Sequence, residues 1–191
     1  MTRFNGPQWS PDGRSLLYLQ GRDFGEFSLT RINRATGAQV PMLPDDRPVL
    51  EAAWSPDGTH LLYTAERRGR ADIYVIAVAD GEPHNLTENN FQDTRPSWSP
   101  DGTQIAFLSN REGGWHLYVT SINGEPAQRL TTVPLGISAT WATLAWSPDG
   151  ARIAYTHEGD LFTIETADGS VRRLTIDQPI PATLNWFTFR P

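Results

Sequence analysis

Hydrophobic residues in this chain form short runs separated by clusters of glycine, proline, asparagine and aspartate. The runs are rich in β-branched and aromatic residues, which favours strands over helices. Runs such as 16–19 and 73–76 are apolar at successive positions, so both faces of these strands need cover from another layer. Segments 128–131 and 172–175 alternate polar and apolar residues, as expected of solvated outer strands. The pattern predicts an all-β chain without helices.

The pentapeptide Trp-Ser-Pro-Asp-Gly occurs four times, with spacings of 45, 44 and 48 residues between its tryptophans, Trp9, Trp54, Trp98 and Trp146. A period in this range indicates a repeat protein. Within each copy, proline sets φ and glycine supplies a positive φ, so the motif predicts a tight turn between two strands. In the third copy we expect strands at 96–99, 104–109, 115–122 and 126–131. Matching second strands are expected at 16–20, 61–65 and 153–157, and third strands at 27–32, 73–78 and 161–166.

One repeat shows a family resemblance through Asn85-Leu86-Thr87, Asp93 to Gly102, Ile105-Ala106-Phe107, Asn110-Arg111-Glu112-Gly113 and Leu117-Tyr118-Val119. These residues resemble the WD-like repeat of TolB-type β-propellers, and they are also similar to the propeller domains of prolyl-oligopeptidase and tricorn-type peptidases. The resemblance implies a β-propeller with four four-stranded antiparallel blades in one domain, residues 1–191. The blades are expected at about 1–43, 44–87, 88–131 and 132–175.

The C-terminal segment continues the repeat, because Phe189-Arg190-Pro191 looks like a decayed Trp-Ser-Pro at the same period. We therefore expect an extra inner strand at 182–191. TolB-type rings usually have more than four blades, so the outward faces of the end blades would be bare. The first hypothesis is a homodimer that forms one larger ring, with Trp186, Phe187 and Phe189 at the junction. The alternatives are a small closed four-bladed ring and a segment of a longer TolB-like propeller.

Composition removes several function classes. The net charge of −6 argues against a nucleic-acid or anionic-membrane partner. The chain has no lysine and no cysteine, which excludes Schiff-base lysines, thiol nucleophiles, disulfides and cysteine metal sites. Its longest apolar stretch, 73–79, is too short to cross a bilayer. The first twenty residues lack a signal-peptide pattern, so a cytoplasmic location is expected, or a periplasmic one if the chain is a mature or truncated form.

Candidate binding residues fall on the edge of the blades where the variable loops gather. The longest connection between blades carries Leu135, Ile137 and Trp141, which predict a patch for a protein or peptide partner. The alternative is that Trp141 caps the central channel or packs between blades. Arg67, Arg68 and Arg70 are clustered in one loop and can clamp a carboxylate or phosphate; the alternative is a merely solvated cluster.

The remaining polar residues favour structural roles. The aspartates of the four turns, Asp12, Asp57, Asp101 and Asp149, are expected to bond nearby backbone N–H groups. Asn5, Glu51 and Asp93 are candidates for lining a cation site, but no spacing resembles a calcium loop. The four histidines, His60, His84, His116 and His157, lack metal-ligand spacing and are expected to be ordinary strand residues. We predict no catalytic residue, metal or cofactor.

The sequence is compatible with three functions. The first is a non-catalytic scaffold that binds a protein or peptide and self-associates. The second is an accessory, gating propeller of a hydrolase or peptidase, although no Gly-x-Ser-x-Gly pentapeptide occurs here. The third is a propeller enzyme with carboxylates such as Glu51 or Asp93 in its channel, for example a glycosidase or lyase. The sequence favours the first.

Overall fold

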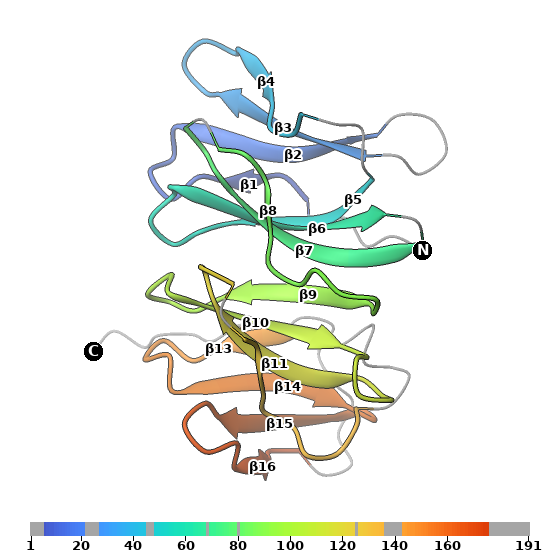
Figure 1. Ribbon diagram of the computed structural model, residues 1–191. Coiled ribbons are helices and arrows are strands. Elements are labelled where there is room, and N and C mark those ends of the chain that lie inside the picture. The colour runs from blue at the N-terminus through green and yellow to red at the C-terminus, as the bar shows by residue number, and fades with distance from the viewer. Residues whose placement is uncertain are drawn as a thin grey trace, which may run out of the picture. The chain divides into compact units, whose positions relative to one another are not determined.

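The computed structural model describes residues 6–21, 27–44, 48–67, 69–79, 81–124, 126–135 and 143–175. These residues form four antiparallel sheets of four strands each and contain no helix, as the sequence predicted (Figure 1). None of them therefore provides a helix of the length and apolarity that a membrane span requires. The chain divides into two compact units, Met1–Asn90 and Phe91–Pro191, and each unit holds two sheets.

Unit 1 contains the first two sheets, in which strands adjacent in sequence are adjacent in space. The strands of the first are β1 (Gln8–Trp9), β2 (Ser15–Gly21), β3 (Phe27–Asn33) and β4 (Gln39–Pro41). The strands of the second are β5 (Val49–Trp54), β6 (His60–Arg67), β7 (Arg70–Ala77) and β8 (His84–Asn85).

Unit 2 repeats this arrangement with two further sheets. The strands of the third are β9 (Asp93–Trp98), β10 (Gln104–Ser109), β11 (His116–Ser121) and β12 (Gln128–Arg129). The strands of the fourth are β13 (Leu144–Trp146), β14 (Arg152–His157), β15 (Asp160–Glu165) and β16 (Val171–Arg173). The predicted second and third strands are confirmed, with ends that differ by a few residues.

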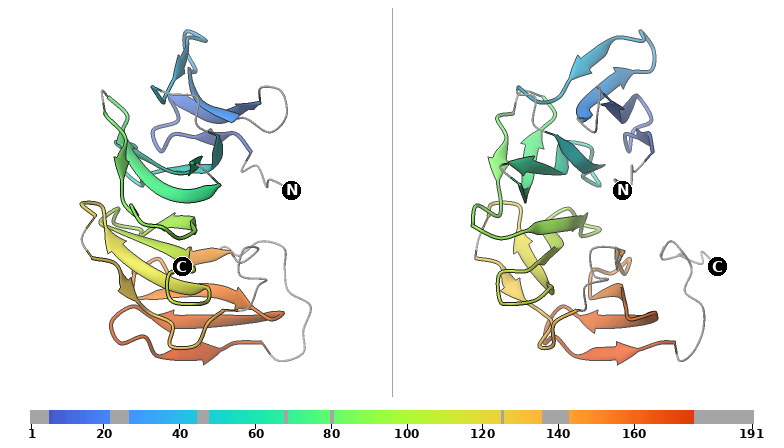
Figure 2. Two further views of the ribbon diagram at one scale, coloured as in Figure 1. Left: turned by 45° about the vertical axis from the view of Figure 1, so that its right-hand side comes forward. Right: turned by 90° about the vertical axis from the view of Figure 1, so that its right-hand side faces the viewer.

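The two sheets of each unit lie face to face (Figure 2). In unit 1 the face of the second sheet that carries Trp54 packs against the first sheet. The same face carries Leu61, Tyr63, Tyr74 and Ile76. The first sheet contributes Leu17 and Leu29 to the same core. In unit 2 the fourth sheet likewise turns its tryptophan-bearing face, with Trp146, Ile153 and Tyr155, toward the third. We call this side of each sheet its Trp face and the other side its seat face.

Each Trp-Ser-Pro-Asp-Gly motif forms the tight turn that its sequence predicts. In the second sheet the Asp57 carboxylate accepts hydrogen bonds from the Ser55 hydroxyl at 2.6 Å and the Thr59 amide at 3.0 Å. The Gly58 amide donates to the Ser55 carbonyl at 2.9 Å, and Gly58 has φ of 74°. The other three copies make the same bonds. The turn aspartates therefore serve the scaffold.

The fourth strand of a sheet is fastened by a threonine that follows a leucine. The Thr87 hydroxyl accepts the Ile73 amide at 2.9 Å, and the Leu86 amide donates to the Ile73 carbonyl at 2.8 Å. The third and fourth sheets repeat this with Thr131 and Thr175. Because the Thr87 hydroxyl is buried in this bond, Asn85-Leu86-Thr87 is a structural motif of the repeat.

The predicted extra inner strand at 182–191 lies outside the described residues, as do its junction residues Trp186, Phe187 and Phe189.

Candidate functional site

A polar hollow lies at the edge of the second sheet where β6 meets β7 and where the chain leaves β8. It has a volume of about 340 Å³ and is bordered by Arg67, Arg70, Asp72, Asn85, Glu88, Asn89 and Asn90. Pockets of a few hundred Å³ are typical of small-ligand sites. All of these residues belong to unit 1.

The hairpin between β6 and β7 places two cations side by side. Arg67 and Arg70 are directly paired across the two strands, and Gly69, with φ of 78°, allows the tight connection between them. Like charges in directly opposed positions destabilise a hairpin. The Arg70 guanidinium donates to the Asn90 side-chain carbonyl at 2.9 Å, which draws it toward the hollow.

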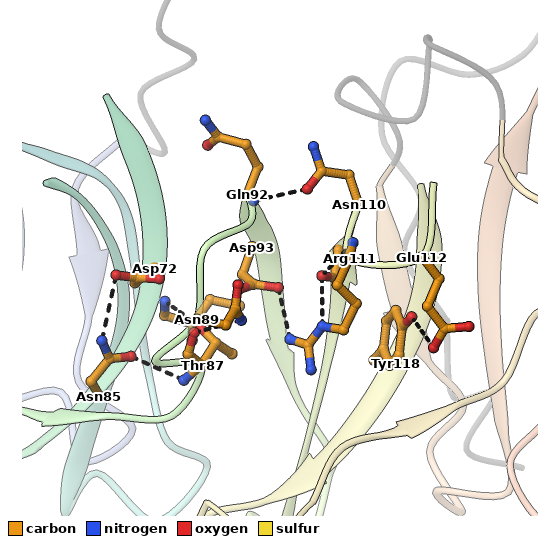
Figure 3. A network of polar contacts seen from close by, with 12 residues as sticks. Asp72, Asn85, Thr87, Asn89, Gln92, Asp93, Asn110, Arg111, Glu112 and Tyr118 are labelled. Atoms are coloured by element: carbon orange, nitrogen blue, oxygen red, sulfur yellow. Dashed lines mark hydrogen bonds and ion pairs between the residues drawn. The ribbon is translucent and has the colours of Figure 1, made fainter. Parts of the chain in front are cut away.

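The opposite wall is held by short turns around Thr87. The Asn85 side-chain oxygen accepts the Thr87 amide at 2.9 Å, and the Asn89 side chain donates to the Thr87 carbonyl at 2.7 Å. The Asn85 side-chain nitrogen lies 3.4 Å from the carboxylate of Asp72, a buried residue at the start of β7 (Figure 3). Because these bonds fix the asparagine side chains, the wall is ordered before any ligand arrives.

A second polar cluster, the Arg111 network, lies in unit 2 (Figure 3). The Arg111 guanidinium donates to the Asp93 carboxylate at 2.9 Å and to the Ser109 hydroxyl at 2.8 Å. Its central carbon lies 4.7 Å from the ring centroid of Tyr118 and 5.3 Å from that of Phe107. These cation–π contacts add to the ion pair. The carboxylate of Asp93 is fully buried.

Tyr118 completes this network on its outer side. Its hydroxyl donates to the Glu112 carboxylate at 2.9 Å, and Glu112 also pairs with Arg129. Burial, reinforced by the bond to Glu112, raises the pKa of Tyr118 to about 12. A phenol with so high a pKa stays protonated at neutral pH and is a poor base or nucleophile. We therefore assign the Arg111 network to stability.

The structure brings together only part of the residue set singled out from the sequence. Arg67 and Arg70 both border the polar hollow, whereas Arg68 lies outside the described residues. Leu135 is buried in the core of unit 2, where its amide bonds the Trp115 carbonyl. Ile137 and Trp141 lie outside the described residues, so the patch they predict stays a prediction.

Two carboxylates considered for a cation site, Asp93 and Glu51, have protein partners in the structure. Asp93 pairs with Arg111, and Glu51 accepts the Thr64 hydroxyl at 3.1 Å. Asn5 lies outside the described residues. All four histidines lie in strands. Among the described residues no three histidine, aspartate or glutamate side chains gather as a metal site would require.

Sequence reasoning missed five residues of the polar hollow: Asp72, Asn85, Glu88, Asn89 and Asn90. One signal was available, because Glu88-Asn89-Asn90 follows the Leu-Thr of the second repeat as a wholly polar run. Polar runs between strands usually indicate loops, so this signal alone did not distinguish a site from a connection.

Comparisons with known proteins give a family match and several similar proteins. Residues 3–178 match the family model described as the TolB beta propeller domain. The uncharacterized peptidase YuxL of Bacillus subtilis (strain 168) is 34% identical over 96 residues, which are 47% of this chain and 15% of that protein. The putative TolB from Agrobacterium tumefaciens has 24% identity and a TM-score of 0.72 over 88% of this chain and 64% of its own. TolB from Acinetobacter baumannii has 25% identity and a TM-score of 0.73 over 92% of this chain and 44% of its own.

The chain thus spans less than two thirds of the length of each of these relatives. Its four-stranded antiparallel sheets correspond to propeller blades, and propeller domains of peptidases are among its relatives. The match to the family model extends over nearly the whole chain. This chain belongs to the TolB β-propeller domain family.

Proposed function

We propose that this propeller is a non-catalytic binding module that takes a protein or peptide segment at the polar hollow and that self-associates. The single observation that carries the binding role is the opposed pair Arg67 and Arg70 at the rim of a hollow whose far wall is already ordered. A bound carboxylate would relieve the repulsion between the two guanidinium groups and accept bidentate hydrogen bonds.

The other charges of the hollow favour a carboxylate over a phosphate. Asp72 and Glu88 line the same space, so a ligand group with a charge near −2 meets more repulsion there than a monoanion does. The asparagine side chains that border the hollow can form hydrogen bonds with peptide amides. The proposed ligand is therefore a peptide segment that presents one carboxylate, either a chain terminus or an acidic side chain.

A titration followed by NMR tests this role. The probe is N-acetyl-triglycine with a free carboxylate, compared with its C-terminal amide. Saturable shifts of the amides of residues 67–73 and 84–90 with the acid alone would support the proposal. Equal responses to acid and amide, or shifts elsewhere only, would contradict it. Arg70→Gln should weaken the response, while Arg129→Gln in unit 2 serves as a matched control.

A second candidate is an accessory propeller of a hydrolase. The similarity of 96 residues to the peptidase YuxL favours it. The reading frame of the gene distinguishes the two, because the accessory role requires a hydrolase domain in the same polypeptide or in a tightly bound partner. Co-purification of such a domain would support the second candidate over the first.

A further inference from the structure

Within unit 1, the described residues leave the Trp face of the first sheet open. Trp9 is 58% exposed, whereas Trp54 packs on the core of unit 1 and Trp146 is only 7% exposed. Leu16 and Tyr18 lie on the same side as Trp9 and are half-buried. Their counterparts in the second sheet, Leu61 and Tyr63, are buried completely.

Within each unit, the Trp face is covered by the seat face of the preceding sheet. The Trp54 indole donates to the Gln8 carbonyl at 3.3 Å, and the Trp146 indole donates to the Ser97 carbonyl at 3.1 Å. Gln8 and Ser97 are the residues directly before the tryptophans of the preceding sheets. The same contact is thus made twice, by equivalent residues.

Apolar burial is the larger part of this contact: Trp146 is 7% exposed and belongs to the same buried core of unit 2 as Leu117 and Leu130. Burying an aromatic side chain of this size contributes more than a single neutral hydrogen bond. An open Trp face is therefore expected to associate chiefly through its apolar surface.

Within unit 2, the described residues leave the seat face of the fourth sheet open, and its side chains match those of the third sheet. In the third sheet the seat residues Leu117 and Leu130 are buried against the Trp face of the fourth. Their equivalents in the fourth sheet are Leu161, which is half-buried, and Leu174, which is 46% exposed, compared with 5% for Leu130. Ala145 holds the position of Ser97, and a carbonyl oxygen can accept two hydrogen bonds.

We propose that the Trp face of the first sheet docks on the seat face of the fourth sheet of a second copy of this chain. The docking reproduces the contact that already joins the sheets within each unit, with Trp9 in the place of Trp54 and Trp146. Trp9 of one copy packs on Leu161 and Leu174 of the next. The contact is head-to-tail, so it either closes into a ring or extends the array. This inference rests on the proposed self-association and names its surface.

Light scattering and sedimentation of four proteins test this. The measured mass of the wild type is expected to be at least twice the 21.3 kDa mass of one chain. Trp9→Ser removes a hot-spot aromatic and should raise the dissociation constant at least about 30-fold. Leu174→Ser should weaken association from the other side. Val40→Ser is the matched control, because Val40 is exposed on the opposite face of the same sheet as Trp9 and should change nothing.

Mixing the two weakened variants gives the sharpest result. A pair of Trp9→Ser and Leu174→Ser chains retains one intact junction, so the mixture should associate more tightly than either variant alone. Trp9 is exposed, so its variant should keep the wild-type circular dichroism, and its melting temperature should match that of the wild type at concentrations where both are monomeric. An associated wild type that is unaffected by Trp9→Ser overturns the docking surface but leaves self-association standing. A wild type that stays monomeric at all concentrations overturns both.

Discussion

Replacing Arg111 by methionine separates the ion pair from packing in the Arg111 network. Methionine keeps an apolar stem against Tyr118 and Phe107 but removes the guanidinium that bonds the Asp93 carboxylate at 2.9 Å. The carboxylate of Asp93 is fully buried, while the side chain of Arg111 is 23% exposed. The substitution therefore removes a guanidinium that pairs with a buried anion.

The magnitude follows from this burial. Removing one partner of a buried ion pair costs about 3–5 kcal/mol. Because Arg111 is partly exposed, water can reach part of the site, so we expect a loss of about 3 kcal/mol, at the low end. With a urea slope near 2 kcal/mol/M, the midpoint of unfolding should fall by about 1.5 M.

The assay is urea unfolding, followed by circular dichroism, together with hydrogen exchange of the amides in β10 and β11. Asp93→Asn combined with Arg111→Met should recover at least about 2 kcal/mol of the loss, because the buried charge is gone. Arg152→Met is the control: its partner Glu165 is solvent-accessible, so the loss should stay within about 1 kcal/mol. A loss below about 1 kcal/mol for Arg111→Met would refute the assignment of this network to stability.

Three further substitutions test the scaffold. The Ser55 hydroxyl and then the Thr59 amide lower the pKa of Asp57 to about 2, so the stabilising contribution of the carboxylate is complete above pH 4 and is lost as the pH falls toward 2. The difference in unfolding free energy between wild type and Asp57→Asn should therefore shrink between pH 5 and pH 2.5 in urea titrations. A constant difference would contradict this. Thr131→Val leaves the buried Leu117 amide without its acceptor at 3.1 Å and should cost about 1–3 kcal/mol in the same assay, whereas Thr131→Ser should largely retain stability. Gly58→Ala should lower the free energy of unfolding by about 1 kcal/mol because Gly58 has φ of 74°. Gly6→Ala, at an uncrowded position without positive φ, is the control and should have little effect. Equal effects of the two substitutions would refute a role for the positive φ of Gly58.

The turns and the strand order were predictable from the sequence because their causes are local. Asp57 bonds an amide only two residues away, and the positive φ of Gly58 belongs to the same turn. The alternation of apolar runs with these turns was enough to assign four strands to each repeat. The predicted outer strands were also right in place, although β12 and β16 are shorter than their alternating patterns suggested.

The polar hollow and the pairing of Asp93 were not predictable in the same way. Asp93 and Arg111 are eighteen residues apart and meet only because β9 and β10 are paired. Arg70 and Asn90 are twenty residues apart and belong to different connections. Such contacts depend on tertiary register, which the spacing of residue types does not encode.

The exposure of Trp9 was hidden from the sequence for a related reason. The first residue of all four pentapeptide copies is a tryptophan, and the motif does not say which of these four tryptophans has a neighbouring sheet to cover it. The contrast between Trp9 and Trp146 emerges only when the burial of the sheets is compared. The proposed docking surface therefore follows from a difference among the repeats and not from the repeat itself.

The most direct test of the account is photo-crosslinking from position 9, with benzoylphenylalanine in place of Trp9, under conditions where the wild-type protein is associated. We predict a covalent product of two chains in which position 9 is joined to the segment 143–146 or to the neighbourhood of Leu174. Abolition of that product by Leu174→Ser would support the docking surface. A crosslink confined to a single chain, or one that joins position 9 to the seat face of the first or third sheet, would contradict it.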